Sequence, residues 1–168
     1  MTWRPLAALS ILEARSSFLA EIRGYFTAIG YLEVEVPTLA LAPASDPWLD
    51  SFEVHSPGTT APTHYLLTSP EAYLKRLLAR DQRAIFCLAR AYRAEPQARL
   101  HNPEFTMLEW YQPGGDFQAM CAELQALSVA LGFGQPRIET YRSLFESVYS
   151  VNPHRLTADA ADALVRQH

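Results

Sequence analysis

The stretch that decides the fold reads RAEPQARLHNPEFTMLEWY and covers Arg93 to Tyr111. An apolar run over residues 84–95 and an alternating run over 104–112 each predict a strand. Eight residues, 96–103, separate the two strands, although a tight hairpin turn needs only two. This loop contains an Arg, a His, an Asn and two prolines. A loop so long and so rich in hydrogen-bond donors raises the question of what it binds.

Strand geometry decides which side chains of the hairpin share a face. Successive side chains of a strand point to opposite faces of the sheet, so alternate residues lie together. Arg93 and Glu95 share one face of the first strand. One face of the second strand carries Phe105, Met107, Glu109 and Tyr111. If both sets lie on the same side, one patch holds a guanidinium, carboxylates, an aromatic ring and a phenol hydroxyl. Such a patch does not suit a core, because burying a polar group without a partner costs roughly 2–7 kcal/mol.

A plainer interpretation is a surface hairpin that ion pairs hold together. Arg93 would then pair with Glu95, and Arg99 with Glu104. Exposed ion pairs of this kind contribute only about 0–1 kcal/mol each. The charge pattern alone favours neither the binding site nor the surface hairpin.

The rest of the chain predicts further helices and strands. Apolar residues at helical spacing indicate a helix over 7–29, and the alternation in YLEVEV, residues 31–36, indicates a strand covered on one side. Ser69 as cap and Pro70 as first residue predict a helix that runs to residue 80. We also expect a loop at 38–50, strands at 51–56 and 64–69, a helix at 116–134, and two short helices in 138–168 broken at Asn152-Pro153. This order predicts an α+β domain on a mostly antiparallel sheet.

Composition narrows the class of protein. The 168 residues suffice for one domain with its own core, and a net charge of −4 argues against general nucleic-acid binding. No apolar run reaches the roughly 18 residues of a membrane helix. The isolated Cys87 and Cys121 predict buried thiols in a reducing compartment, with the cytoplasm as the expected location. We interpret the four cations within residues 75–83 as a solvated helix face.

Three blocks of the sequence resemble class II aminoacyl-tRNA synthetases of the lysyl branch. YRAE followed by RLHNPEFTMLEWY, within residues 92–111, resembles motif 2 of that class. FTAIGYLEVEVPTL, residues 26–39, resembles motif 1, and TSPEAYLKRLL, residues 68–78, resembles the segment that supplies an amino-acid-binding carboxylate. The blocks also stand in the order that the family has. The resemblance implies a class II synthetase-like antiparallel sheet flanked by helices.

The resemblance also implies roles for particular residues, with ATP and Mg²⁺ as cofactors. Arg93 would be catalytic and hold the ATP α-phosphate and the substrate carboxylate, a bidentate task that suits a guanidinium. The other residues expected to bind ATP are Glu95, Arg99, His101, Asn102 and Phe105. Those expected to bind a lysine-like substrate are Ser69, Glu71, Glu109 and Tyr111. No metal-ligating side chain is predicted. A substrate carboxylate is already an anion at neutral pH, so the reaction needs positioning and charge stabilisation rather than a general base.

The start of the chain bears on the branch of the family. The motif 1 helix begins within about ten residues of Met1, which leaves no room for the anticodon-binding domain of lysyl-tRNA synthetases. This favours a resemblance to the paralogues that attach (R)-β-lysine to elongation factor P. It implies activation of lysine or (R)-β-lysine as an adenylate, transfer to a lysine of elongation factor P, and a homodimer formed through motif 1.

The end of the chain bears on completeness. We find no motif 3 before His168, so we predict a catalytic core over 1–135 and the start of a helical connecting region over 136–168, truncated before motif 3. The chain alone is then expected to be inactive or incomplete. Two alternatives stay open: a non-catalytic dimerisation or binding module, and a fragment of a lysyl-tRNA synthetase that charges tRNA.

Overall fold

The computed structural model describes residues 7–58, 62–95, 98–99 and 101–167. The chain forms two compact units, the first ending at Glu123 and the second beginning at Leu124. Helix α3 (Phe117–Ala130) starts in the first unit and ends in the second. The division into a core over 1–135 and a connecting region over 136–168 stays a prediction.

The main sheet has three strands and carries the long hairpin. Strand β5 (Ile85–Tyr92) lies in the centre, between β1 (Leu32–Glu33) and β6 (Glu104–Tyr111). Strands β5 and β6 pair antiparallel along their whole length, which confirms the predicted hairpin and the α+β class. Strand β1 pairs parallel to β5, which the sequence did not predict. A parallel pair needs a long crossover connection, and the chain between these two strands supplies it.

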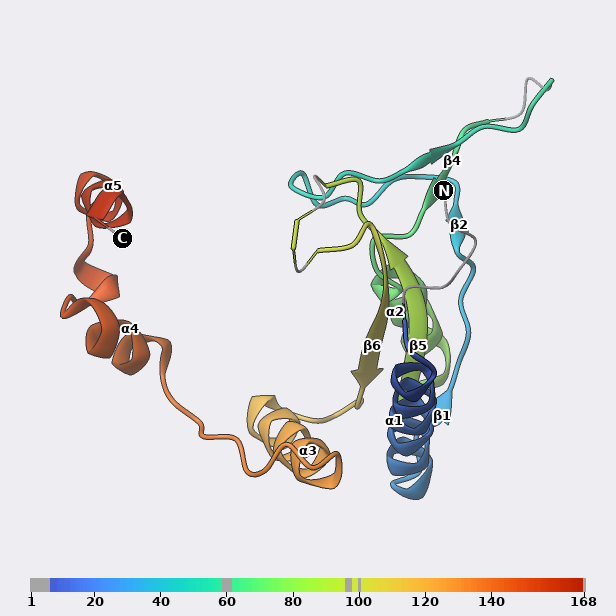
Figure 1. The fold of residues 1–168 in the computed structure, drawn as a ribbon, viewed down its shortest axis with the longest axis horizontal. Helices are drawn as coiled ribbons and strands as arrows, with labels where there is room; N and C mark the ends of the chain where they lie inside the picture. The colour runs from blue at the N-terminus through green and yellow to red at the C-terminus, as the bar shows by residue number, and fades with distance from the viewer. Residues whose placement is uncertain (1–6, 59–61, 96–97, 100, 168) are drawn as a thin grey trace. The chain divides into compact units, whose positions relative to one another are not determined.

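Two helices cover opposite faces of this sheet. Helix α1 (Leu9–Ala28) lies in front of β5 in Figure 1, and helix α2 (Glu71–Asp81) lies behind it. On the α1 face, the ring of the fully buried Phe26 stacks on Phe86, with 4.8 Å between the ring centroids. On the α2 face, the fully buried Leu74 packs in a cluster with β5. The sheet is therefore held between two apolar layers, as the predicted helix periodicity requires.

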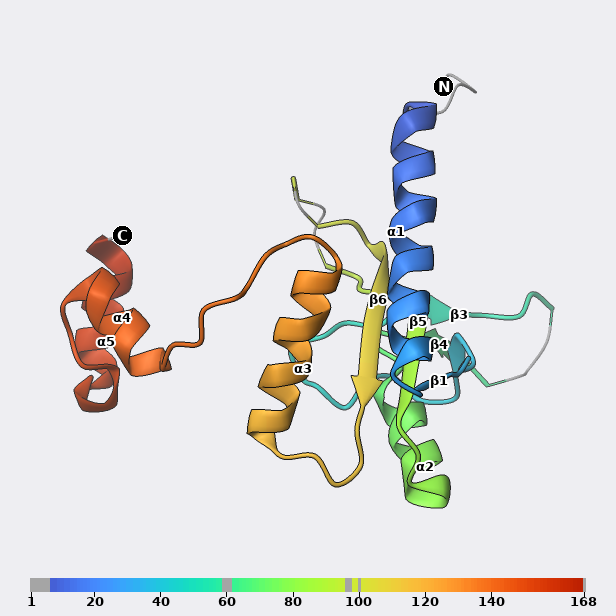
Figure 2. The ribbon, with the colours of Figure 1, turned by 90° about the horizontal axis from the view of Figure 1, so that it is seen from below.

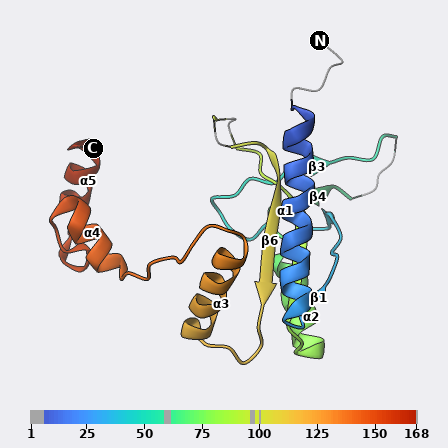
Figure 3. The ribbon, with the colours of Figure 1, turned by 60° about the horizontal axis from the view of Figure 1, so that its bottom comes forward.

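Helix α1 runs alongside β6, as Figures 2 and 3 both show. Near the start of the strand, Arg15 Nη2 donates a hydrogen bond to Thr106 Oγ1 at 2.7 Å. Near the end of the strand, the Phe26 ring lies 5.5 Å from the Trp110 ring, centroid to centroid. These contacts fix one face of the hairpin against α1 and leave the other face to α2.

A second, smaller antiparallel sheet adjoins the first. Its strands are short and stand in the order β2-β4-β3. Their bounds are Leu39–Ala40 for β2, Glu53–Val54 for β3 and His64–Leu66 for β4. The Tyr92 N–H donates to the Leu67 carbonyl at 2.8 Å, so the chain just after β4 reaches the end of β5. The predicted strands at 51–56 and 64–69 exist, but each is shorter than expected.

Three local predictions need correction. The strand predicted over 31–36 pairs only at Leu32–Glu33. Ser69 does not cap α2, because Pro70 is already in the right-handed helical region and itself takes the cap position, with no side-chain cap. Cys121 is half-buried rather than buried, whereas Cys87 is buried as expected.

The second unit contains the end of α3 and three short helical segments. Their bounds are Tyr141–Tyr149 for α4, Pro153–Arg155 for the 3-10 helix η1, and Ala158–Gln167 for α5. The Thr140 side chain caps α4, and the Asn152 side chain caps η1. The predicted break at Asn152-Pro153 is thus confirmed. No described helix combines the length and apolarity that a membrane span requires.

Candidate active site

The pairing register places three of the predicted site residues, Phe105, Glu109 and Tyr111, on one face of the hairpin. Phe105 lies opposite Ala91, and Glu109 lies opposite Cys87. Directly opposed residues of an antiparallel pair point to the same side, and Cys87 belongs to the cluster around α2. Just beyond β5, the Arg93 N–H donates to the Pro103 carbonyl at 2.9 Å, which continues the same register. For Arg93, Phe105 and Glu109 the predicted shared face is therefore confirmed, and it is the face that α2 covers.

At the loop end of this face, a guanidinium lies on an aromatic ring. The Arg93 Cζ stands 5.3 Å from the centroid of the Phe105 ring, a cation–π distance. The Arg93 Nε is buried and has no hydrogen-bond partner among the described residues. A buried donor without a partner costs about 1–3 kcal/mol, more when it is charged. The arrangement therefore suits an anion next to a flat ring.

At the other end of the face, Glu109 and Tyr111 form a hydrogen-bonded pair. The Tyr111 hydroxyl donates to Glu109 Oε2 at 3.0 Å. Burial raises the pKa of Glu109 above its ordinary value; the Glu71 carboxylate raises it further, and the Tyr111 hydrogen bond and Lys75 lower it. Burial and the Glu109 charge raise the pKa of Tyr111. Glu109 thus responds to charges on α2, so the two elements share one electrostatic environment.

The thiol of Cys87 lies on the same face. Burial, together with the charge of Glu109 and weaker contributions from Glu33 and Glu35, raises its pKa to about 11. Cys87 also packs against Leu74 in the core cluster. The thiol is therefore a neutral packing group at this site and not a nucleophile.

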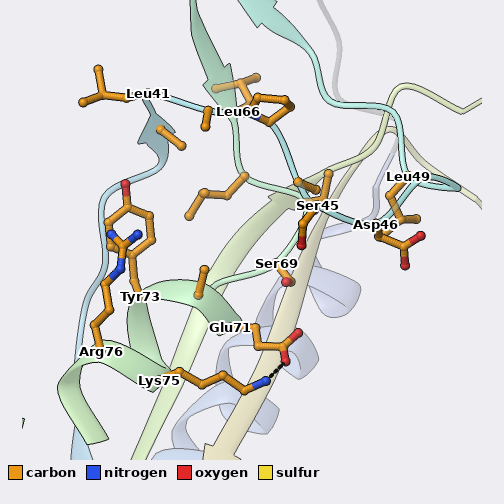
Figure 4. Close-up of a pocket in the computed structure, with 17 residues that line it drawn as sticks. Leu41, Ser45, Asp46, Leu49, Leu66, Ser69, Glu71, Tyr73, Lys75 and Arg76 are labelled. Carbon is orange, nitrogen blue, oxygen red and sulfur yellow. Dashed lines mark hydrogen bonds and ion pairs between the residues drawn. The ribbon is translucent and has the colours of Figure 1, made fainter. Parts of the chain in front are cut away.

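A hollow of about 560 Å³ opens beside the start of α2. The segments that line it are residues 40–46, Leu49, residues 66–69 and the first turns of α2. Figure 4 shows the side chains of Ser69, Glu71 and Lys75 on its wall. Lys75 Nζ forms an ion pair with Glu71 Oε1, one helical turn away. Two of the predicted substrate-binding residues, Ser69 and Glu71, therefore line a cavity of ligand size.

The loop residues predicted to bind ATP are exposed. They are Glu95, Arg99, His101 and Asn102. Between them, Ala98 and His101 pair through their backbones. Pro96, Gln97 and Leu100 lie outside the described residues. The surface-hairpin interpretation expected Glu104 to pair with Arg99. Glu104 pairs with Arg90 instead, with 3.5 Å between Glu104 Oε1 and Arg90 Nη1.

The sequence interpretation missed two parts of this site. Lys75 was assigned to a solvated helix face, and its side chain is indeed 62% exposed, but its ammonium turns to Glu71 at the hollow. The signal was available, because a Glu and a Lys four residues apart on a helix are neighbours. The wall formed by residues 40–46 had no such signal, since a loop's position depends on contacts distant in sequence.

No group of three or more His, Cys, Asp or Glu that could hold a metal ion occurs within the part of the chain that the structure describes. The described residues therefore offer donors for an anion and carboxylates for a cation, without a side-chain cage for a metal.

An antiparallel strand pair held between two helices, with an arginine and an aromatic ring at its loop end, is the arrangement that the resemblance to class II synthetases implies. The family described as "tRNA synthetases class II (D, K and N)" matches residues 1–129. The chain belongs to this family.

Three similar proteins of 40% identity or more carry the name "Elongation factor P--(R)-beta-lysine ligase". The Vibrio cholerae protein is 40% identical over 155 residues, which cover 90% of this chain and 48% of the relative. The Pectobacterium carotovorum protein is 44% identical over 129 residues, 75% of this chain and 40% of the relative. The Klebsiella pneumoniae protein is 40% identical over 167 residues, which cover 95% of this chain and 50% of the relative. The chain spans about half the length of the curated relatives it matches.

Proposed function

We propose that this chain carries the ATP- and amino-acid-binding part of a ligase that activates lysine or (R)-β-lysine and transfers it to a lysine of elongation factor P. The names of the relatives, which are ligases of (R)-β-lysine and elongation factor P, support this proposal. The site geometry supports it independently, because one face of the hairpin offers a place for an anion and a place for cations.

The single observation that carries the proposal is that Arg93 Nε is buried and finds no hydrogen-bond partner among the residues that the structure describes. In the proposed role, the guanidinium bridges the ATP α-phosphate and the substrate carboxylate, both of which are anions. A planar fork of donors suits two oxyanions at once better than a point charge does. Binding these anions also gives a hydrogen-bond partner to a donor that already lost its contact with water when the chain folded.

The neighbouring residues have matching roles in this proposal. Phe105 stacks on the adenine ring from the same face as Arg93. Glu95 accepts from the adenine amino group, and Asn102 contacts the nucleotide. Arg99 and His101 reach the outer phosphates from the exposed loop. Their side chains are exposed and therefore accessible to a bound nucleotide.

The other end of the face would hold the amino acid. Glu71 and Glu109 supply two negative charges for the ammonium groups of lysine, and Tyr111 orients Glu109 through its hydrogen bond. Ser69 borders the hollow that Glu71 lines. A substrate with two ammonium groups matches a site with two carboxylates, which is why a lysine-type amino acid fits better than an apolar one.

The proposed reaction has two steps. A substrate carboxylate oxygen forms a bond to the α-phosphorus, the bond from that phosphorus to the bridging oxygen breaks, and pyrophosphate leaves. The neutral amine of the acceptor lysine then attacks the acyl carbon, AMP leaves with the bonding electrons, and the amine loses its proton. Mg²⁺, bound with the phosphates, would help to neutralise their charge; Arg93 stabilises the charge that develops at the α-phosphate.

The test is calorimetric binding of ATP with Mg²⁺ to the wild type and to Arg93→Ala. We expect the substitution to weaken ATP binding about 10- to 100-fold, the usual cost of removing a hydrogen bond to a charged group. Arg90→Ala is the matched control, because Arg90 is exposed on the same stretch and pairs with Glu104 instead. No ATP binding by the wild type, or an equal loss in both variants, would contradict the proposal.

A further inference from the structure

The geometry points to Lys75 as a specificity-determining residue: its ammonium pairs with the Glu71 carboxylate until the ammonium group of a ligand takes its place. This inference rests on the proposed function, because it concerns the same hollow. Lys75 is then neither a catalytic residue nor a passive surface charge. It is an internal competitor that only a cationic ligand can displace.

The first observation is the contact itself. Lys75 Nζ pairs with Glu71 Oε1, and both residues line the hollow. Figure 4 shows the Lys75 side chain stretched along the wall with its nitrogen at the Glu71 carboxylate. The two side chains are 62% and 52% exposed, so solvent reaches the pair. Exposed pairs contribute about 0–1 kcal/mol, and a competing ammonium can therefore break this one.

The second observation is the local balance of charge. Glu109 responds to both α2 residues, to the carboxylate of Glu71 and to the ammonium of Lys75. The Lys75 ammonium thus acts on two carboxylates, of which Glu71 lines the hollow. The other carboxylate that lines the hollow is Asp46, whose Oδ1 accepts a hydrogen bond from the Trp48 N–H at 2.9 Å. Glu71 is therefore the carboxylate of the hollow that Lys75 neutralises, and a ligand ammonium that replaces Lys75 there preserves the balance of charge.

The third observation is that no neighbouring cation duplicates Lys75. It is the one lysine in the sequence. The next residue, Arg76, also lines the hollow, but its Cζ lies over the Tyr73 ring, 5.3 Å from the centroid. Lys75 alone presents a primary ammonium on an alkyl stem, which is the group that a lysine-type ligand brings. A ligand without an ammonium group cannot replace Lys75 at the Glu71 carboxylate, so the ion pair favours ligands that carry such a group.

Calorimetry of the 168-residue chain with L-lysine and with hexanoate tests the inference. Hexanoate has the same six-carbon chain and carboxylate but no ammonium. We expect Lys75→Gln and Lys75→Met to bind lysine about two- to five-fold more tightly, because the competitor is gone and an exposed pair is worth about 0–1 kcal/mol. Hexanoate should gain nothing. Lys75→Arg keeps the charge and should show no gain with lysine.

Two further variants separate displacement from a general charge effect. Arg80→Gln removes one cation from the same helix, where it pairs with Asp81 away from the hollow, and it should leave lysine affinity unchanged. In a Glu71→Gln background, Lys75→Gln should also give no gain, because neither ammonium then has its carboxylate.

The outcomes distinguish this inference from the proposed function. Lysine binding that Lys75→Gln weakens or leaves unchanged overturns the inference alone and leaves the proposed function standing. A gain that persists in the Glu71→Gln background also overturns it, since the effect would then be a field effect. Absence of lysine binding to the wild type overturns both.

Discussion

Glu109 is a carboxylate at a half-buried position, where its charge lowers the stability of the fold but serves the proposed substrate site. Its pKa is raised in the folded chain, mainly by burial. A raised pKa means that the folded state binds the proton more readily than the unfolded state does. The resulting stabilisation is complete below the ordinary carboxyl pKa and is lost as the pH rises through the folded pKa. Above its folded pKa the ionised Glu109 therefore costs stability, while its charge serves the proposed substrate site.

Glu109→Gln should accordingly stabilise the protein at pH 7, because it removes the charge and keeps an oxygen for the Tyr111 hydroxyl. We expect a gain of less than about 1 kcal/mol, since solvent screens a carboxylate that is only half-buried. The gain should shrink as the pH falls through the raised pKa of Glu109, and it should be least below the ordinary carboxyl pKa of about 4.3, where the group is protonated in both the folded and the unfolded chain. Urea unfolding at both pH values measures this. The exposed Glu104→Gln is the control, and a less stable Glu109→Gln at pH 7 would refute the argument.

The residues that sequence reasoning placed well are those fixed by local geometry. Arg93, Phe105 and Glu109 share a face because strand alternation and the hairpin register dictate it. The exposure of Lys75 was predicted correctly, but its place beside a hollow was not, because the wall formed by residues 40–46 depends on contacts distant in sequence. Ser69 was read as a cap from its type alone, whereas Pro70 takes that position. Strand alternation and helical spacing predict which side chains share a face of an element, but they do not predict which other segment packs against that face.

Helix α1 shows the same limit at the scale of an element. Its predicted apolar face exists, but only Ile22 and Phe26 are buried in the chain. Phe26 carries much of the contact, since its ring packs on both Phe86 and Trp110. Strand lengths were predicted less well, because alternation continues beyond the residues that find a pairing partner.

Phe26→Ala should destabilise the first unit by about 3–5 kcal/mol, because it leaves a cavity between α1 and the sheet. Thermal or urea unfolding followed by circular dichroism measures the loss. Glu21→Ala, at an exposed position of the same helix, should change the free energy of unfolding by no more than about 0.5 kcal/mol. Equal effects of the two substitutions would show that the α1 contact does not hold the sheet.

At the scale of the whole molecule, the first half of α1 leaves apolar side chains uncovered. Leu9, Ile11 and Leu12 are all largely exposed in the single chain. Contiguous exposed apolar residues mark interaction surfaces more often than scattered ones do. The resemblance to class II synthetases implied a homodimer through this segment, and the exposed side chains offer the material for it.

We therefore predict that light scattering gives a mass of twice 18.9 kDa for the wild type. Ile11→Asp should shift the protein to the monomer, because a charge in an apolar interface costs its desolvation. Ser17→Asp, at an exposed polar position of the same helix, should remain dimeric. A wild type that is monomeric at all accessible concentrations would remove the dimer from the account.

The high pKa of Cys87 also bears on how readily its thiol reacts with oxidants. Peroxides and electrophiles attack the thiolate form of cysteine. With a pKa of about 11, only about one Cys87 thiol in ten thousand is ionised at pH 7, and burial shields the sulfur from solvent. We therefore expect oxidants to modify Cys87 more slowly than an exposed cysteine, so that the face that carries Arg93 and Glu109 keeps its packing.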